Sequence, residues 1–159
     1  MNSIIEEYYP MFELYQRLRN QMTATLNDSD LDYTLGGNNK SLGVLCVEIG
    51  EIEQSYIHSF KTFEQNFSYK NDEQGLEGSV ARLSAWFQEL DQELRNTIES
   101  LTQEDISNRV IDRGPEFKVP PHIQLEIYKE ALLIFYGKSS VYLKAMGKEL
   151  PQQWQAWIA

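Results

Sequence analysis

Apolar residues recur at intervals of three or four along four separate stretches of this chain. That spacing places them on one face of an α-helix, which turns once every ~3.6 residues. The pattern therefore predicts four amphipathic helices, over residues 3–26, 42–63, 80–101 and 121–146. The segments between them are rich in Asn, Asp, Ser and Gly, which are typical of turns.

The starts of the first three helices carry recognisable signals. Ser41 or Asn39 can cap the second helix and Ser79 the third, because their side chains accept hydrogen bonds from free backbone N–H groups. Pro10 lies inside the first helical pattern. Proline lacks a backbone donor, so either the helix kinks there or it begins at Tyr9, with Pro10 in its first turn.

The last helix has a proline start and a glycine stop. Pro120 and Pro121 open it, and Gly147 follows its final residues. Before it, residues 108–119 alternate in polarity around a Gly-Pro pair and predict a short hairpin or an extended lid. After it, residues 151–159 are expected to dock on the helices as a short turn.

Four helices of this length, with one long joint before the last, predict an all-α four-helix bundle of the up-and-down type. The chain has no internal repeat, low-complexity tract or change of composition that would mark a domain boundary. Its 159 residues suffice for one hydrophobic core. We therefore expect a single domain over residues 1–159.

Charge and composition exclude several classes of function. The net charge is −10 and no basic cluster interrupts it, so we expect no nucleic-acid partner. No apolar run approaches the roughly 18–20 residues that span a bilayer, and the N-terminal residues are acidic where a signal peptide is basic. The single cysteine, Cys46, lies in an apolar run and is expected to be a buried, unreactive thiol. We expect a cytoplasmic protein without membrane contact.

Two segments of the chain resemble the DinB/YfiT-like family of metalloenzymes. The first covers residues 41–60. The second helix of the family begins with Ser or Thr and a short apolar run, followed by a histidine ligand and, further on, a Glu. Ser41 and Glu53 match this pattern, whereas Glu48 takes the place of the histidine.

The second segment is the last helix, in which the family has two histidines one turn apart, then a Gly and an apolar ending. Gly137 and the ending over residues 143–151 match, but Ala131 and Phe135 stand where the histidines would be. The resemblance implies a bundle with crossing connections, a pocket at one end and, in relatives, a divalent metal held by three histidines. Some members resemble thiol S-transferases, in which the metal would lower the pKa of a thiol or of water.

Ala131 and Phe135 are expected to face the interior of the bundle. A step of about 100° per residue puts both near the middle of one apolar stripe on the last helix. That stripe consists of Ile127, Tyr128, Ala131, Ile134, Phe135, Tyr142 and Ala145. A methyl and a phenyl group offer a metal no lone pair, so we expect no metal at the position that the family uses.

Carboxylates are the best remaining candidates for a polar pocket. Glu53 lies close to the centre of the apolar stripe of the second helix, where a carboxylate must be paired, hydrogen-bonded or neutral. We expect Glu48 at the rim of the same pocket. The partner of Glu53 is expected on the last helix, among Gln124, Tyr128, Tyr142 and Lys138. Glu53 could instead reach the surface or make one structural hydrogen bond.

The two histidines are not expected to rebuild a metal site. His58 falls opposite the apolar stripe of the second helix, on the solvent side. His122 and Glu126 have a spacing that can chelate a metal, but both face away from the apolar side of the last helix.

Functions from different classes remain open. The first is a DinB-like bundle without its metal, which binds a small apolar ligand or a protein. Exposed Trp154 and Trp157 would favour association, including a homodimer. The second is a thiol S-transferase or hydrolase with a rearranged site, in which Glu48, Glu53 and a tyrosine, or a divalent metal, replace the histidines. A third interpretation is a structural bundle whose likeness to the family is coincidental. Only the second function would need a cofactor.

Overall fold

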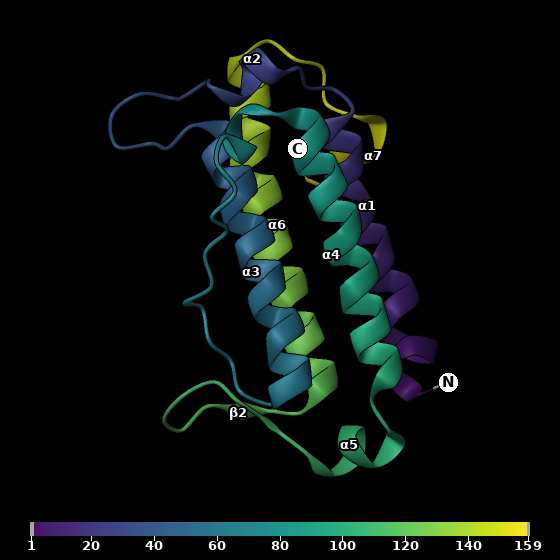
Figure 1. The fold of residues 1–159 in the computed structure, drawn as a ribbon. Coiled ribbons are helices and arrows are strands. Elements are labelled where there is room, and N and C mark those ends of the chain that lie inside the picture. Colours follow the sequence, from purple (N-terminus) through teal and green to yellow (C-terminus); the bar gives the residue numbers. More distant parts are fainter. Residues whose placement is uncertain (1, 159) are drawn as a thin grey trace.

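The computed structural model describes residues 2–158, so Met1 and Ala159, the two ends of the expected domain, lie outside the described part. Four long helices form a bundle (Figure 1). They are α1 (Tyr9–Thr23), α3 (Leu42–Thr62), α4 (Val80–Ser100) and α6 (Pro121–Ala145). The all-α four-helix bundle predicted from the sequence is confirmed.

Shorter elements precede, connect or follow the long helices. They are the π-helical turn η1 (Ile4–Tyr8), α2 (Asp28–Leu31), the 3₁₀ turn η2 (Leu76–Gly78), α5 (Gln103–Asn108), β1 (Ile111–Asp112), β2 (Lys118–Val119) and α7 (Gln152–Trp157). The two strands pair antiparallel, with Ile111 opposite Val119 and Asp112 opposite Lys118. This pairing confirms the hairpin expected before the last helix.

The helices begin where the local chemistry predicts. The α-helical part of the first helix starts at Tyr9, with Pro10 in its first turn, where the missing N–H removes no helical hydrogen bond. Ser41 and Ser79 each accept a hydrogen bond from a backbone N–H in the first turn of α3 and α4. Gly147 follows α6 with a φ of 72°, a conformation that favours glycine.

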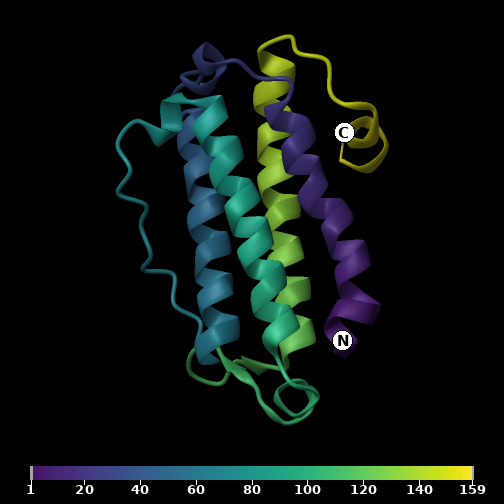
Figure 2. The ribbon, with the colours of Figure 1, turned by 45° about the vertical axis from the view of Figure 1, so that its right-hand side comes forward.

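α3 and α4 run in the same direction, and α1 and α6 run opposite to them (Figure 2). The connection over residues 63–79 returns along the length of the bundle before α4 begins. The starts of α3 and α4 therefore lie so close together that a Cβ atom on Gly43 would be 1.9 Å from the backbone oxygen of Glu77. The expected up-and-down order is wrong, whereas a crossing connection, which the family resemblance implies, is present.

One continuous core fills the bundle and draws on all four long helices. Phe12, Phe60, Phe87 and Leu132 are among its completely buried or almost completely buried members. α3 packs against α4 and α6, and α1 also packs against α4 and α6. α1 and α3 therefore lie on one diagonal of the bundle, and α4 and α6 on the other.

The C-terminal tail docks on the bundle through α7. Trp154 is fully buried beside the ring of Tyr136, and its Nε1 donates a hydrogen bond to the backbone oxygen of Leu18 at 3.0 Å. The docking is confirmed, but Trp154 is not the exposed residue that the sequence suggested, and Trp157 alone of the pair is exposed. Among residues 2–158, no helix has both the length and the apolar character needed to cross a membrane.

Candidate functional site

Three of the residues expected at the site line one groove between α3 and α6. Glu48 comes from α3, and Ala131 and Phe135 come from α6. The groove has a volume of about 180 Å³, and its other lining residues are Leu45, Ile49, Ile52, Ile134 and Lys138. Because only two of these side chains are charged, the groove suits a mainly apolar molecule.

The two charged side chains of this groove differ in their partners. The Glu48 carboxylate forms an ion pair with Lys40, which belongs to the loop before α3. The Glu48 side chain is 34% exposed and lies at the rim. Lys138 forms no ion pair within residues 2–158. Of the two charged side chains of the groove, it is therefore the one without an oppositely charged partner in the described part.

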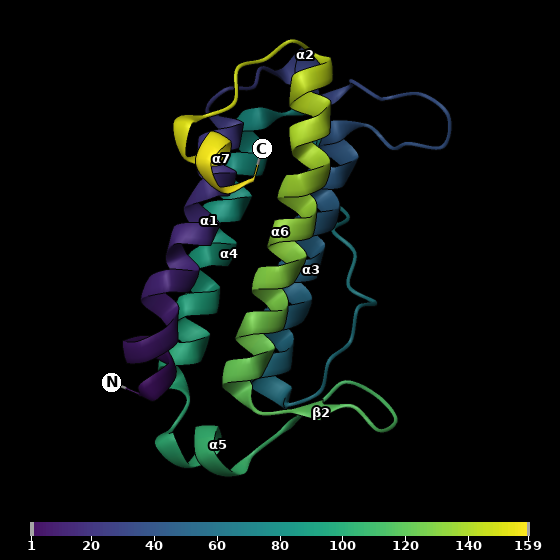
Figure 3. The same cartoon turned by 180° about the vertical axis from the view of Figure 1, so that it is seen from behind.

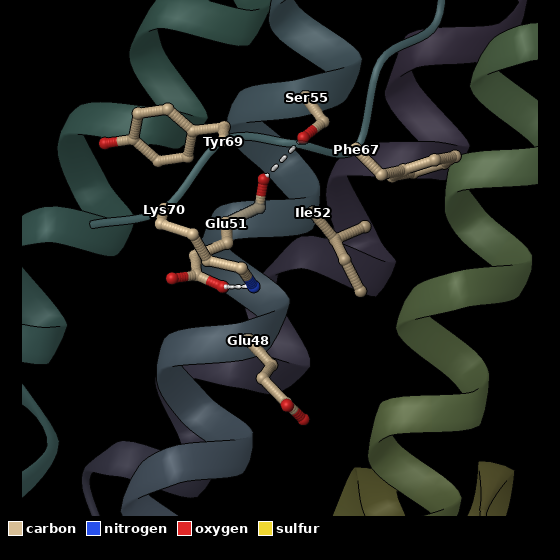
Figure 4. Close-up of a pocket in the computed structure, with 7 residues that line it drawn as sticks. All are labelled: Glu48, Glu51, Ile52, Ser55, Phe67, Tyr69 and Lys70. Carbon is tan, nitrogen blue, oxygen red and sulfur yellow. Dashed lines mark hydrogen bonds and ion pairs between the residues drawn. The ribbon is translucent and has the colours of Figure 1, made fainter.

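A second groove adjoins the first, because Glu48 and Ile52 line both. It lies between α3 and the crossing connection and has a volume of about 170 Å³ (Figure 4). The Glu51 carboxylate anchors the connection there, since it accepts hydrogen bonds from Lys70 Nζ at 2.6 Å and from the backbone N–H of Asn71 at 3.1 Å. Glu48 points away from this pair, so the two grooves do not share a carboxylate cluster.

Glu53 lies outside both grooves, in the interior of the bundle. Its side chain is completely buried, and its carboxylate accepts hydrogen bonds from Arg19 Nη1 at 2.6 Å and Gln16 Nε2 at 3.3 Å. Arg19 Nη2 donates to Asp91 Oδ1 at 2.7 Å, and the guanidinium lies 4.1 Å from the centre of the Phe87 ring. The hydrogen-bond partners of Glu53 thus come from α1, and one of them, Arg19, also binds Asp91 of α4. The expectation that α6 would supply a partner is wrong.

This buried cluster contains one cationic group and two carboxyl groups. Burial raises the pKa of Asp91 to about 7, the Arg19 guanidinium opposes the rise, and the Glu53 carboxylate adds to it. Burial disfavours the charged form of Arg19, but Glu53 and Asp91 outweigh that effect and raise the pKa of Arg19 well above its ordinary value. The protonation of Asp91 is therefore a property of the whole cluster.

Gln124 and Tyr128 also lie apart from the groove. Gln124 is buried near the hairpin, where its Nε2 donates to Ser59 Oγ at 2.8 Å and its Oε1 accepts from Arg113 Nη1 at 2.7 Å. Tyr128 is completely buried among aromatic rings, and its hydroxyl has no hydrogen-bond partner among residues 2–158. Neither side chain hydrogen-bonds to Glu53, so the single pocket expected from the sequence is divided among three places.

The buried face of α6 differs from the predicted stripe. Leu132 and Tyr136 are completely buried, whereas Ile134, which the stripe included, is 61% exposed. Phe135 is 5% exposed and Ala131 is half-buried, on the flank that faces the groove. α6 carries apolar residues on most of its circumference, so its periodicity alone does not show which side is buried.

The residues of the groove do not fit the metal that the family resemblance implies. Of Glu48, Ala131 and Phe135, which the family resemblance places at the ligand positions, only Glu48 has an atom that can coordinate a metal. Within residues 2–158, no three His, Cys, Asp or Glu side chains gather in a group that could hold a metal ion.

Other side chains that could bind a metal or act as nucleophiles are scattered. His58 is exposed on α3, and His122 packs against Tyr8 with tilted rings, whose centres are 5.4 Å apart. Glu126 forms an ion pair with a lysine one turn further along α6. Cys46 is completely buried, and burial raises the pKa of its thiol to about 12. A thiol of such high pKa is a poor nucleophile at neutral pH.

The interior cluster contains the polar residues that sequence reasoning missed. A weak signal for them exists in α1, where Phe12, Gln16 and Arg19 follow one another at helical spacing and so share a face. Asp91 gives a similar signal, because it lies four residues after Phe87 and three residues before Leu94, which both belong to the apolar face of α4.

Comparisons with known proteins agree with the architecture. No protein-family model matches this sequence, and no curated protein matches it. Among the solved structures that resemble it is YjoA, a DinB-like protein from Bacillus subtilis, with a TM-score of 0.67 and 19% sequence identity. The alignment covers 88% of this chain and 92% of that chain. At this identity the likeness shows the fold alone, so the chain has a DinB-like fold.

Proposed function

We propose that this chain is a metal-independent binding protein that holds a small apolar molecule in the groove between α3 and α6. One observation carries the proposal. The positions that correspond to the metal ligands of the family lie together in a groove, and that groove is lined by aliphatic and aromatic side chains instead of ligand atoms. An apolar molecule placed there would remove this surface from water, which is favourable by about 25 cal/mol per Å².

The position of Glu53 supports binding over catalysis. A catalytic carboxylate must touch its substrate, yet Glu53 is completely buried and bound to Arg19. Glu48, the carboxylate that does reach the groove, is paired with Lys40. The alternative function, a thiol S-transferase or hydrolase with a carboxylate site, has no comparable geometric support.

The proposal can be tested by filling the groove. Ala131→Trp would place an indole ring where a ligand would lie, whereas Ala81→Trp adds the same ring to an exposed position of α4. We would titrate each protein with the neutral fluorescent probe N-phenyl-1-naphthylamine. We expect the wild type and Ala81→Trp to bind one probe per chain, and binding to Ala131→Trp to fall at least ~10-fold, the equivalent of about 1.4 kcal/mol.

Equal binding to all three proteins would show that the groove is not the site. Metal analysis of the purified protein provides an independent check, because stoichiometric zinc, nickel or iron would overturn a metal-independent function. Thiol-transferase activity that survives chelation but disappears in a folded Glu48→Gln variant would establish the alternative.

A further inference from the structure

α1 and α4 enclose a third groove, away from the α3–α6 groove. Figure 3 shows the pair α1 and α4 on one side of the bundle and the pair α6 and α3 on the other. This α1–α4 groove has a volume of about 220 Å³, and every side chain that lines it carries a nitrogen or oxygen atom. It shares no lining residue with the α3–α6 groove. Its lining suits a small polar molecule instead of an apolar one.

The floor of the α1–α4 groove belongs to the buried charge cluster. Asp91 and Gln16 both line the groove. Asp91 accepts a hydrogen bond from Arg19, and Gln16 donates one to Glu53. The side chains of Arg19 and Glu53 are completely buried, whereas that of Asp91 is 20% exposed. Asp91 is therefore the charged member of the cluster that a molecule in the groove can touch.

The ion pairs at the rim of the groove are balanced. Arg17 and Arg95 both contact Glu13, at 2.9 and 3.5 Å, and so compete for one carboxylate. Arg95 also contacts Glu99 at 3.1 Å, so two positive charges meet two negative ones. Asp91 lies one turn before Arg95 on α4, a spacing at which opposite charges commonly pair. No ion pair joins these two residues within residues 2–158, so the rim leaves the charge of Asp91 uncompensated.

The floor, in contrast, carries an excess negative charge. The Arg19 guanidinium is shared between the carboxyl groups of Glu53 and Asp91, so one negative charge lacks a cation when both are ionised. A proton can supply the missing positive charge. Burial raises the pKa of Asp91 to about 7, Arg19 opposes the rise, and Glu53 and Glu13 add to it. Once that proton is lost, a cationic group that enters the groove meets an unbalanced carboxylate in partly buried surroundings.

We propose that the α1–α4 groove binds a small primary amine, whose ammonium group lies against the Asp91 carboxylate and balances the charge of the cluster. An ammonium group has three donors and forms strong, charge-assisted hydrogen bonds with a carboxylate. The amides of Asn20 and Gln88 line the groove from the two helices, so they can bind a hydroxyl or amide group elsewhere in the molecule. The ligand class is thus a short, hydrophilic amine with a single positive charge.

Two amines, 2-aminoethanol and 4-aminobutanamide, serve as probes. Both carry an ammonium group at about pH 8, where Asp91 is mostly ionised. In ¹H–¹⁵N NMR titrations at that pH and about 150 mM salt, we expect at least one of them to bind saturably, with a Kd on the order of 1 mM. 1,2-Ethanediol lacks the charge and tetramethylammonium lacks the N–H donors, so both should bind at least ~10-fold more weakly.

Replacing the carboxylate tests the position of the ammonium group. Asp91→Asn should weaken binding of the amine at least ~10-fold. The variant should remain folded at this pH, because it removes the excess charge and keeps an acceptor for Arg19. Glu89→Gln is the matched control, since it removes the same charge from an exposed position of the same helix that does not line the groove. We expect it to bind the amine within about twofold of the wild type.

Filling the groove tests its location independently of Asp91. Gln88→Trp should weaken amine binding, whereas Ala81→Trp, at an exposed position of α4 outside the groove, should not. Failure of both amines to bind saturably, equal binding of tetramethylammonium, or equal losses in Asp91→Asn and Glu89→Gln would each overturn the proposal. So would undiminished binding to Gln88→Trp. None of these results depends on whether the α3–α6 groove holds an apolar ligand, because the two grooves have no lining residue in common.

Discussion

Replacing Asp91 by asparagine should change how the stability of this bundle depends on pH. Asp91 shares the Arg19 guanidinium with Glu53, so the cluster carries one more negative than positive charge when both carboxyl groups are ionised. The amide side chain of the Asp91→Asn variant would keep an oxygen that can accept from Arg19 Nη2 but could not ionise. The variant thus resembles the wild type with Asp91 protonated.

The magnitude follows from the shift in the pKa of Asp91, from 3.8 in its ordinary surroundings to about 7 in the folded protein. Because the folded-state value is the higher one, folding takes up a proton. The stabilising contribution is fully present below about pH 4 and is lost as the pH rises through about 7. At roughly 1.4 kcal/mol per pKa unit, the wild type should lose about 2–3 kcal/mol of unfolding free energy between about pH 5 and pH 8 relative to the variant.

Urea denaturation of both proteins at several pH values measures this difference. Charge repulsion elsewhere in the chain is common to both and cancels in the comparison. We expect the variant to match the wild type near pH 4, to exceed it slightly at pH 5 and to exceed it most near pH 8. Parallel curves across that range would refute the reasoning. Glu53→Gln should flatten the dependence only in part, because it removes the Glu53 contribution to the pKa of Asp91 but leaves the effect of burial.

Two further predictions concern the packing of α3 and the groove. Gly43→Ala should destabilise the protein by about 1–3 kcal/mol in thermal or urea unfolding, because its Cβ would lie 1.9 Å from the Glu77 backbone oxygen. Gly137→Ala is the control, because a Cβ atom there would have no neighbouring atom within 4 Å. This variant should have neutral or slightly increased stability. Equal effects at both positions would contradict the close approach of α3 to η2. Replacing Glu48, Ala131 and Phe135 together by histidine should create a zinc site detectable by calorimetry, because all three residues line one groove. Failure of a folded triple variant to bind zinc would show that these positions do not converge as metal ligands.

The sequence was sufficient for the helices but not for their directions. Apolar spacing and caps such as Ser41, Ser79 and Gly147 are local signals, and each locates a helix end within a few residues. The direction of α4 depends on the path of residues 63–79, a polar segment with no pattern of its own. Only tertiary contacts, such as the hydrogen bonds that Glu51 accepts from Lys70 and Asn71, place that segment along α3.

The site was predicted only in part, because sequence patterns describe one helix at a time. Periodicity shows that residues share a helix face, and it brought Ala131 and Phe135 together correctly on α6. It cannot show which neighbouring helix supplies a partner. Glu53 was rightly identified as a carboxylate on an apolar stripe, but its partner Arg19 belongs to α1, the helix diagonally opposite α3. A long guanidinium side chain can cross the centre of the bundle, and no spacing rule along one helix describes that reach.

The division of polar and apolar side chains in this bundle bears directly on its function. A buried carboxylate becomes chemically useful when its charge is free to act on a substrate, but Arg19 is already within 2.6 Å of Glu53 and fully buried with it. Removing Arg19 would leave the Glu53 carboxylate without a cation in the interior, which typically costs about 3–5 kcal/mol. The cluster is therefore tied to stability, while the α3–α6 groove is free of that constraint. A ligand could occupy the α3–α6 groove without contacting this cluster, because none of the residues that line the groove belongs to it, and this separation supports the binding function proposed above.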